Sequence, residues 1–154
     1  MGLDMYLSAT IDGHEDEAGY WRKASAIHGW FVREVQGGED DCEEYIVTID
    51  KLLELQKLCE EIVDKALLKH GKVVNGQTLK DGEWVNMYCD GLVVVNAEEI
   101  RSILPPVDGF FFGLNQIDGW FVEEMQHTIK VIDKCKEWCK EENEDIQFKY
   151  RASW

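Results

Sequence analysis

Apolar and polar residues alternate near both ends of the chain. The segment "LDMYLSA" at 3–9 alternates loosely, and "IQFKYRASW" at 146–154 alternates more strictly. A period of two residues is typical of a strand that is buried on one side. We therefore predict a strand near each end, and a further short strand at "EYIVT", residues 44–48.

Other segments place apolar residues three or four positions apart, which indicates amphipathic helices. We predict one helix that ends near Gln36 before Gly37-Gly38, and a second that begins after the N-cap Thr48 and ends at His70-Gly71. A third runs from about Ile117 to Glu141. Its expected inward residues are Ile117, Trp120, Phe121, Ile129, Ile132 and Cys135 or Cys139.

The remaining segments are expected to be short elements and loops. Residues 72–96 contain turn signals between short strands, and "AEEIRSIL" at 97–104 reads as a short helix before two prolines. The acidic segment 10–19 is expected to be a loop. Together these elements predict a single α+β domain over 1–154, with a small, mostly antiparallel sheet packed by two long amphipathic helices and a shorter third.

One segment of the sequence occurs twice, ninety positions apart. Residues 19–36 and 109–126 share a Gly-Trp-Phe-Val core and matching flanks, for example "IHGWFVREVQ" and "IDGWFVEEMQ". Neither copy can bury its apolar face alone, so we predict a strand-helix pseudo-repeat whose two copies face each other. Most of the repeated aromatic residues are expected in the core.

The two copies differ in charge. The first has Arg22-Lys23 where the second has Phe112-Gly113, and its His28 corresponds to Asp118. A helix N-terminus already offers unpaired N–H groups, so two added cations there predict a local anion site. The alternative is that these cations only balance the neighbouring acidic segments "HEDE" and "EDDCEE".

The composition limits the classes of partner. The formal net charge is −15, which opposes binding to DNA, RNA and anionic membranes but permits a basic protein partner. Much of the charge lies in the blocks 39–44 and 141–145. No apolar run is long enough to span a membrane, no signal peptide is recognisable, and five scattered cysteines favour a reducing, cytoplasmic compartment.

Motifs for catalysis and cofactor binding are missing from the sequence. There is no phosphate-binding loop, dinucleotide fingerprint or nucleophile elbow. Cys135, Cys139 and His127 lack the spacing of a metal site and a fourth ligand, so we expect the cysteines in the core and predict neither a metal nor a cofactor.

Four segments resemble a family of small acidic proteins of phages and prophages: "MGLDMYL", "GYWRKASAIHGWF", "GFFFG" and "FKYRASW". The resemblance is weak over residues 72–100, and Ser25 stands where the family leads us to expect Asn. It implies no particular activity. It does imply the cytoplasm of an infected bacterium and an accessory, anti-defence role.

The resulting hypothesis is a non-enzymatic protein that binds and sequesters a small anionic, nucleotide-derived signal, and that forms a homo-oligomer. The predicted ligand-binding residues are Tyr20, Trp21, Arg22, Lys23, His28, Phe112, Asn115 and Arg151. Cations would hold a phosphate and aromatic rings would stack on the base. Two alternatives stay open: an acidic decoy that binds a basic host protein or mimics nucleic acid, and a hydrolase that uses His28 with a carboxylate.

Overall fold

A computed structural model of the chain describes residues 2–109, 112, 115–142 and 146–154. It confirms the predicted α+β fold, with four helices and two antiparallel sheets in the described part. The elements in chain order are β1 (Asp4–Ile11), β2 (His14–Arg22), α1 (Ser25–Glu34), β3 (Tyr45–Val47), α2 (Ile49–Lys65), β4 (Leu68–Lys80), β5 (Glu83–Val94), α3 (Ala97–Ile103), α4 (Gly119–Glu142) and β6 (Gln147–Ser153).

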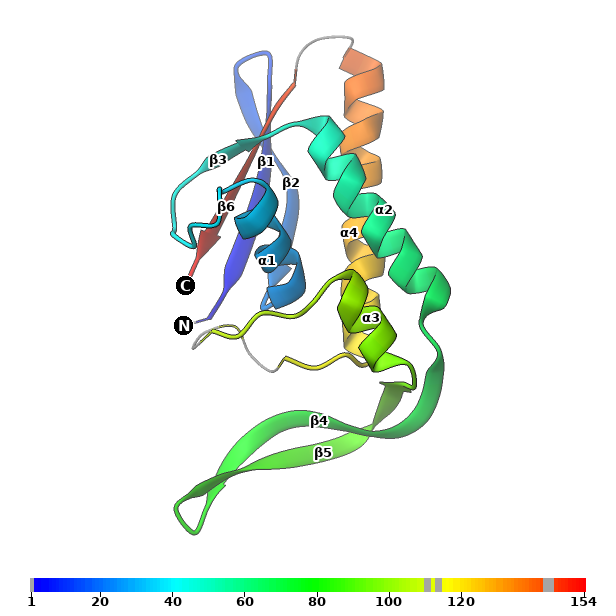
Figure 1. Cartoon of the computed structure of the whole chain (residues 1–154). Coiled ribbons are helices and arrows are strands. Elements are labelled where there is room, and N and C mark those ends of the chain that lie inside the picture. The colour runs from blue at the N-terminus through cyan, green and yellow to red at the C-terminus, as the bar shows by residue number, and fades with distance from the viewer. Residues whose placement is uncertain (1, 110–111, 113–114, 143–145) are drawn as a thin grey trace.

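The main sheet has the strand order β2-β1-β6-β3. The predicted alternation is confirmed in β1 and β6, where Met5, Leu7, Phe148 and Tyr150 are buried while their neighbours are partly or fully exposed. The central strands run antiparallel with Asp4 opposite Ser153, so β1 begins beside the end of β6 (Figure 1).

The helices close one side of the main sheet (Figure 1). In α1, Phe31 stacks on Tyr150 of β6 with ring centroids 3.8 Å apart. The two longest helices pack on each other, where Gln56 of α2 donates to the carbonyl of Ile129 in α4 at 3.1 Å. Thr48 caps α2 as predicted, because its hydroxyl accepts from the Lys51 N–H at 3.2 Å.

The strands β4 and β5 form a separate hairpin, which we call the arm (Figure 1). The arm extends away from the body and is longer than the short strands predicted over 72–96. Its base is fixed by Asn96, whose side-chain amide donates to the Lys65 carbonyl and accepts from the Leu67 N–H, both at 2.9 Å. The predicted helix to His70 ends instead at Lys65, because the residues that follow pair within the arm.

The segment predicted as an acidic loop is the hairpin of β1 and β2. Its turn is Asp12-Gly13, with φ of 50° and 78°, and the arm turns in the same way at Asp81-Gly82 with φ of 50° and 80°. Two consecutive positive φ angles match the right-handed twist of the flanking strands, which is why Asp-Gly favours such turns.

Within the described residues, the two copies of the pseudo-repeat share only their helices. Residues 19–22 belong to β2, whereas the described residues of 109–118 pair with a strand only through the bridge between Val93 and Asp118. Of the predicted segments, Phe110, Phe111, Gly113 and residues 143–145 of the second acidic block lie outside the described residues. No helix within the described ranges combines the length and apolar character needed to cross a membrane.

Candidate functional site

Three of the eight predicted ligand-binding residues lie in the core. The Trp21 ring is 3% exposed, and its Nε1–H donates to the Thr128 hydroxyl at 2.9 Å. Phe112 is also buried and meets the His28 ring edge-on at 5.2 Å. His28 has no exposed surface. These three side chains are therefore part of the core and offer little exposed surface to a ligand.

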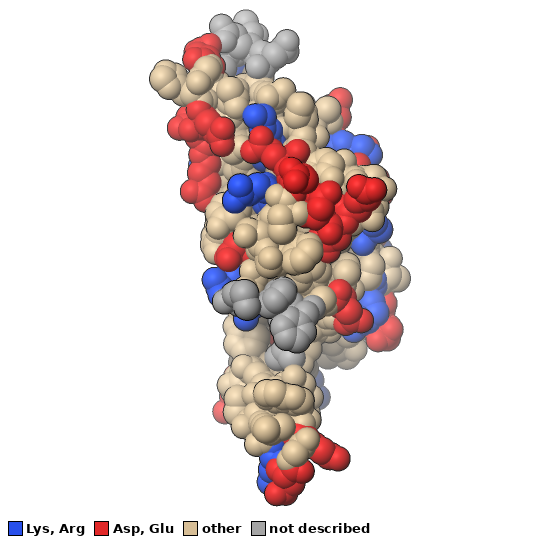
Figure 2. All heavy atoms as spheres, turned by 90° about the vertical axis from the view of Figure 1, so that its left-hand side faces the viewer, with Lys and Arg blue, Asp and Glu red and all other residues tan. Residues whose placement is uncertain are grey.

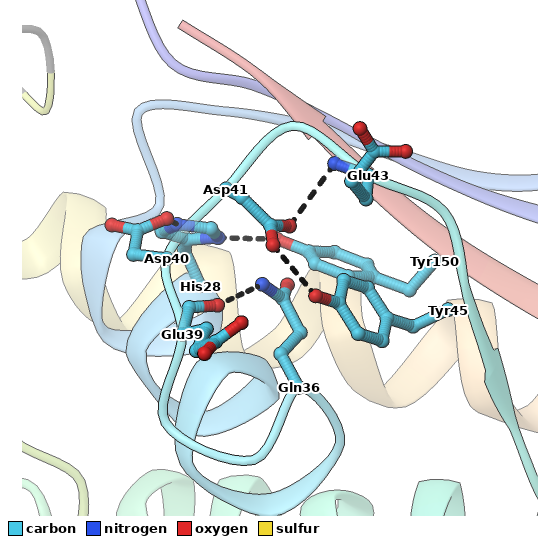
Figure 3. A network of polar contacts seen from close by, with 8 residues as sticks. All are labelled: His28, Gln36, Glu39, Asp40, Asp41, Glu43, Tyr45 and Tyr150. Atoms are coloured by element: carbon cyan, nitrogen blue, oxygen red, sulfur yellow. Dashed lines mark hydrogen bonds and ion pairs between the residues drawn. The ribbon is translucent and has the colours of Figure 1, made fainter.

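A polar network explains why His28 is buried (Figure 3). Its Nε2 lies 2.8 Å from Asp40 and its Nδ1 lies 2.6 Å from the Tyr150 hydroxyl. Burial raises the pKa of Tyr150 well above its ordinary value, so this hydroxyl keeps its proton and can donate to Nδ1 while Nε2–H donates to the carboxylate. The network joins α1, β6 and the segment before β3, and it leaves His28 without access to a substrate.

The same network continues through the acidic block before β3. Tyr45 donates to Asp41 at 2.7 Å, and this hydrogen bond is the main reason that the pKa of Tyr45 is raised to about 12. Gln36 donates to the Glu39 carbonyl at 2.7 Å (Figure 3). These hydrogen bonds therefore hold the connection between α1 and β3 in place, while most carboxylates of the acidic block remain exposed.

The other five predicted residues, which are partly or fully exposed, lie in three places. Lys23 lies beside Arg22 at the turn into α1. On the outer face of the main sheet, Tyr20 and Arg22 both bond Asp4, and Arg151 lies 5.9 Å from the Tyr6 ring. Asn115 accepts from the Ser25 hydroxyl at 3.3 Å and donates to Asp108. The structure does not bring all eight residues together around one cavity.

The two predicted cations nevertheless line two neighbouring hollows. One, of about 350 Å³, lies between the arm and the start of α1 and α4, and Lys23 lines it. The other, of about 340 Å³, is lined by Arg22 with Tyr20 and Trp21. Both hollows share Trp120 and Glu124 of α4, so the two hollows adjoin at these residues.

Trp120 also lies differently from the prediction. It was expected inward, yet its side chain is 49% exposed, whereas its repeat counterpart Trp30 is 3% exposed. The buried face of α4 follows a different row, namely Phe121, Met125, Thr128, Ile132 and Cys135. A residue directly before such a row points about 100° away from it, since a helix has 3.6 residues per turn. The position of Trp120 directly before Phe121 is therefore the sequence signal that its side chain points away from the core.

Glu124 has unusual chemistry for a carboxylic acid. It is half-buried, and burial together with the nearby negative charge of Asp118 raises the pKa of its carboxyl from 4.5 to about 8. Burial also raises the pKa of Asp118, although that carboxylate accepts from the Phe121 N–H at 3.1 Å as the cap of α4. At neutral pH Glu124 therefore holds a proton and can donate a hydrogen bond into the hollow.

Lys23 is held in place by its backbone. Its φ of 56° is in the left-handed region, and its N–H donates to the Leu3 carbonyl at 2.7 Å. A non-glycine residue adopts this conformation at a cost of roughly 1–3 kcal/mol, which the surrounding structure must offset. Among the described residues Lys23 forms no ion pair, in contrast to Arg22, which lies 3.3 Å from Asp4.

Among the described residues, no three His, Cys, Asp or Glu side chains lie close enough together to hold a metal ion. The imidazole Nε2 of His127 instead lies 2.8 Å from the Tyr20 carbonyl. Cys135 is buried in the core and burial raises the pKa of its thiol to about 12. Comparison of the chain with protein-family models, with curated proteins and with solved structures found no match.

Proposed function

We propose that this protein binds a small anionic ligand with a planar ring, of the nucleotide class, in the hollow beside Trp120, and does not convert it. The observation that carries the proposal is the combination in one hollow of about 350 Å³ of a half-exposed indole, a lysine and a protonated carboxyl. Hollows of roughly 300–1,000 Å³ are typical of small-molecule sites.

Each of these groups has a defined task in such a complex. The Trp120 ring stacks on the base, and Lys23 pairs with a phosphate. The protonated Glu124 donates to a ring nitrogen or carbonyl, and the side-chain amides of Asn75 and Gln116, which also line the hollow, can donate or accept at the edge of the base. Arg22 supplies a second cation for a ligand that reaches into the neighbouring hollow.

Binding without turnover fits the residues that line this hollow. Among the described lining residues, Ser25 carries the only hydroxyl, and its Oγ donates to Asn115 and accepts from the Val107 N–H, each at 3.3 Å. A nucleophile needs a neighbouring base that can take its proton, and an amide oxygen is not one. Sequestration of a host signalling nucleotide by a phage accessory protein is the role that we propose for such a site.

Thermal unfolding in the presence of nucleotides tests the proposal. A ligand at about 100 times its Kd should stabilise the native state by roughly 2.7 kcal/mol. We expect Trp120→Ala and Lys23→Ala to lose this gain while the melting temperature without ligand changes little, because both side chains border the hollow.

Matched controls are Trp154→Ala, after β6, and Lys80→Ala, near the tip of the arm; both side chains are exposed and neither lines the hollow. These variants should keep the full response. The proposal is wrong if no mononucleotide, dinucleotide or cyclic nucleotide stabilises the wild type, or if the control variants lose the response to the same extent. Recovery of a chemically altered nucleotide after incubation would favour the hydrolase instead.

The acidic decoy keeps one observation in its favour. Glu39, Asp40, Glu43 and Glu44 are exposed, and Figure 2 shows many carboxylates on the face that it draws. A decoy should bind a basic protein with an affinity that falls steeply as salt is added, and should not respond to nucleotides. The thermal measurement above therefore separates the two functions.

A further inference from the structure

The arm carries an unusual row of exposed apolar side chains. Along β5, residues 84, 86, 88, 90 and 92 share one face because side chains alternate, and Leu79 joins them because it pairs with Trp84. On this face Trp84 is 69% exposed, Tyr88 61% and Leu79 60%. We call these three residues the arm stripe. Nearer the body the same face carries the ion pair of Asp90 with Lys72.

Pairing between its two strands alone does not explain the stability of the arm. Its strands have 13 and 12 residues and pair with each other; the described residues add only one bridge to the body, between Val93 and Asp118. An isolated two-stranded hairpin is at best marginally stable in water, and needs a further layer on its apolar face. The arm leaves the body, and Figure 2 shows its lower part covered mostly by uncharged residues, with charged groups gathered at the tip.

The charge of the arm argues against a basic partner. Residues 67–95 hold three Lys, two Asp and one Glu, so their formal charge is zero, although the chain as a whole carries −15. A basic partner would be drawn to the acidic body rather than to this neutral arm. A second copy of the chain could use the arm without bringing two acidic bodies together.

We propose that the arm stripe is the contact surface of a homodimer in which two arms pack face to face. Asn86 lies midway along the stripe, between Trp84 and Tyr88, and bonds Gln77 on the paired strand at 2.9 Å. A two-fold axis near Asn86 places Trp84 of one copy against Tyr88 of the other, and amide against amide. Such an isologous contact closes at two copies and leaves no open surface for further addition.

The available area is sufficient for a reversible dimer. The three side chains of the stripe expose on the order of 450 Å² per copy, judged from the area that aromatic and leucine side chains offer. Two copies then bury about 900 Å², the size of a weak, transient interface, so a Kd on the order of tens of micromolar or higher is expected.

Sedimentation velocity across a wide concentration range tests the proposal. The wild type should shift from one to two copies as its concentration rises. Trp84→Ser combined with Tyr88→Ser should stay a monomer, whereas Ile46→Ser, which removes an equally exposed apolar residue from β3, should still dimerise. A wild type that stays monomeric throughout, or a double variant that dimerises like the wild type, would overturn the proposal.

Two further measurements distinguish this surface from a charged one. Added salt should strengthen the dimer, because it screens the repulsion between the acidic bodies; weakening by salt would contradict an apolar contact. In a Cys42→Ser background, Asn86→Cys should form a disulfide between copies. Thr78→Cys, on the opposite face of the arm, should not. Equal cross-linking of both variants would exclude the two-fold arrangement.

Discussion

Glu124 shows how one residue can change what a site is able to recognise. Its neighbours on α4, Glu123 and Gln126, are exposed, whereas the Glu124 carboxyl is half-buried and has a pKa of about 8. A carboxylate would repel a phosphate bound at Lys23, while the neutral acid can donate to a base. The protonation state of this residue therefore decides between attraction and repulsion in the hollow.

The pH dependence of stability tests this protonation state. Between pH 4.5 and about 8 the native state holds a proton that the unfolded chain has released, so stability falls as the pH rises through this window. Glu124→Gln should flatten the dependence and stabilise the protein at pH 8 by roughly 2–4 kcal/mol relative to wild type. Urea unfolding at several pH values measures this.

Glu123→Gln is the matched control, because that side chain is the exposed neighbour of Glu124. It should leave the pH profile unchanged. Identical pH profiles for the wild type and Glu124→Gln would show that Glu124 is ionised at neutral pH, and would remove its donor role from the proposed site.

At the scale of single elements, the two Asp-Gly hairpins serve different parts of the molecule. Gly13 joins two strands of the main sheet and Gly82 forms the tip of the arm, and both have positive φ with open space around them. An alanine at either position therefore meets backbone strain rather than a clash, at a cost of roughly 1–2 kcal/mol.

The consequences of these two substitutions should differ. Gly13→Ala is expected to lower the free energy of unfolding of the body by about that amount. Gly82→Ala should mainly accelerate amide hydrogen exchange within the arm, since the turn lies far from the core. If both variants destabilised the body equally, the arm would have to fold as one cooperative unit with the main sheet.

The same elements show what a sequence can reveal and what it cannot. The alternation in β1 and β6 and the Thr48 cap were sufficient to predict those elements. The first half of β2 was missed because residues 14–17 are polar and exposed on both faces, so that only Asp12-Gly13 signalled a hairpin. The arm was predicted as short strands because Asn75-Gly76 and Asp90-Gly91 resemble turns, whereas both pairs lie inside the long strands, the first of them at a register shift.

Only part of the candidate site could be predicted from the sequence. Arg22 and Lys23 were found by comparing the two copies of the repeat, and each lines a hollow. Glu124 was not found, because its raised pKa depends on burial by residues distant in sequence. His28 was assigned to the ligand, but its partners Asp40 and Tyr150 are brought to it only by the fold.

At the scale of the whole molecule, the excess of carboxylates is a cost to folding. Exposed ion pairs such as Lys65 with Glu61 contribute little to stability, and most of the Asp and Glu side chains that the structure describes form no ion pair. Like charges held on one compact body repel each other more strongly than on an expanded chain.

Salt should therefore raise the melting temperature. We expect an increase of several degrees when the ionic strength is brought from a few millimolar to about 0.3 M, since the Debye length then becomes shorter than most charge separations. The measurement is best made on Trp84→Ser combined with Tyr88→Ser, so that association does not contribute. A melting temperature that falls with salt would mean that attractive pairs outweigh the general repulsion.

The pairing of β1 with β6 has a practical consequence for engineering. Because Asp4 stands opposite Ser153, a short flexible linker can join the end of β6 to the start of β1 without distorting the main sheet. New ends can then be opened in the exposed connection at Gly37-Gly38, outside the strands and helices. Such a circular permutant would keep every strand pairing, and would free the neighbourhood of the original ends for a fused reporter.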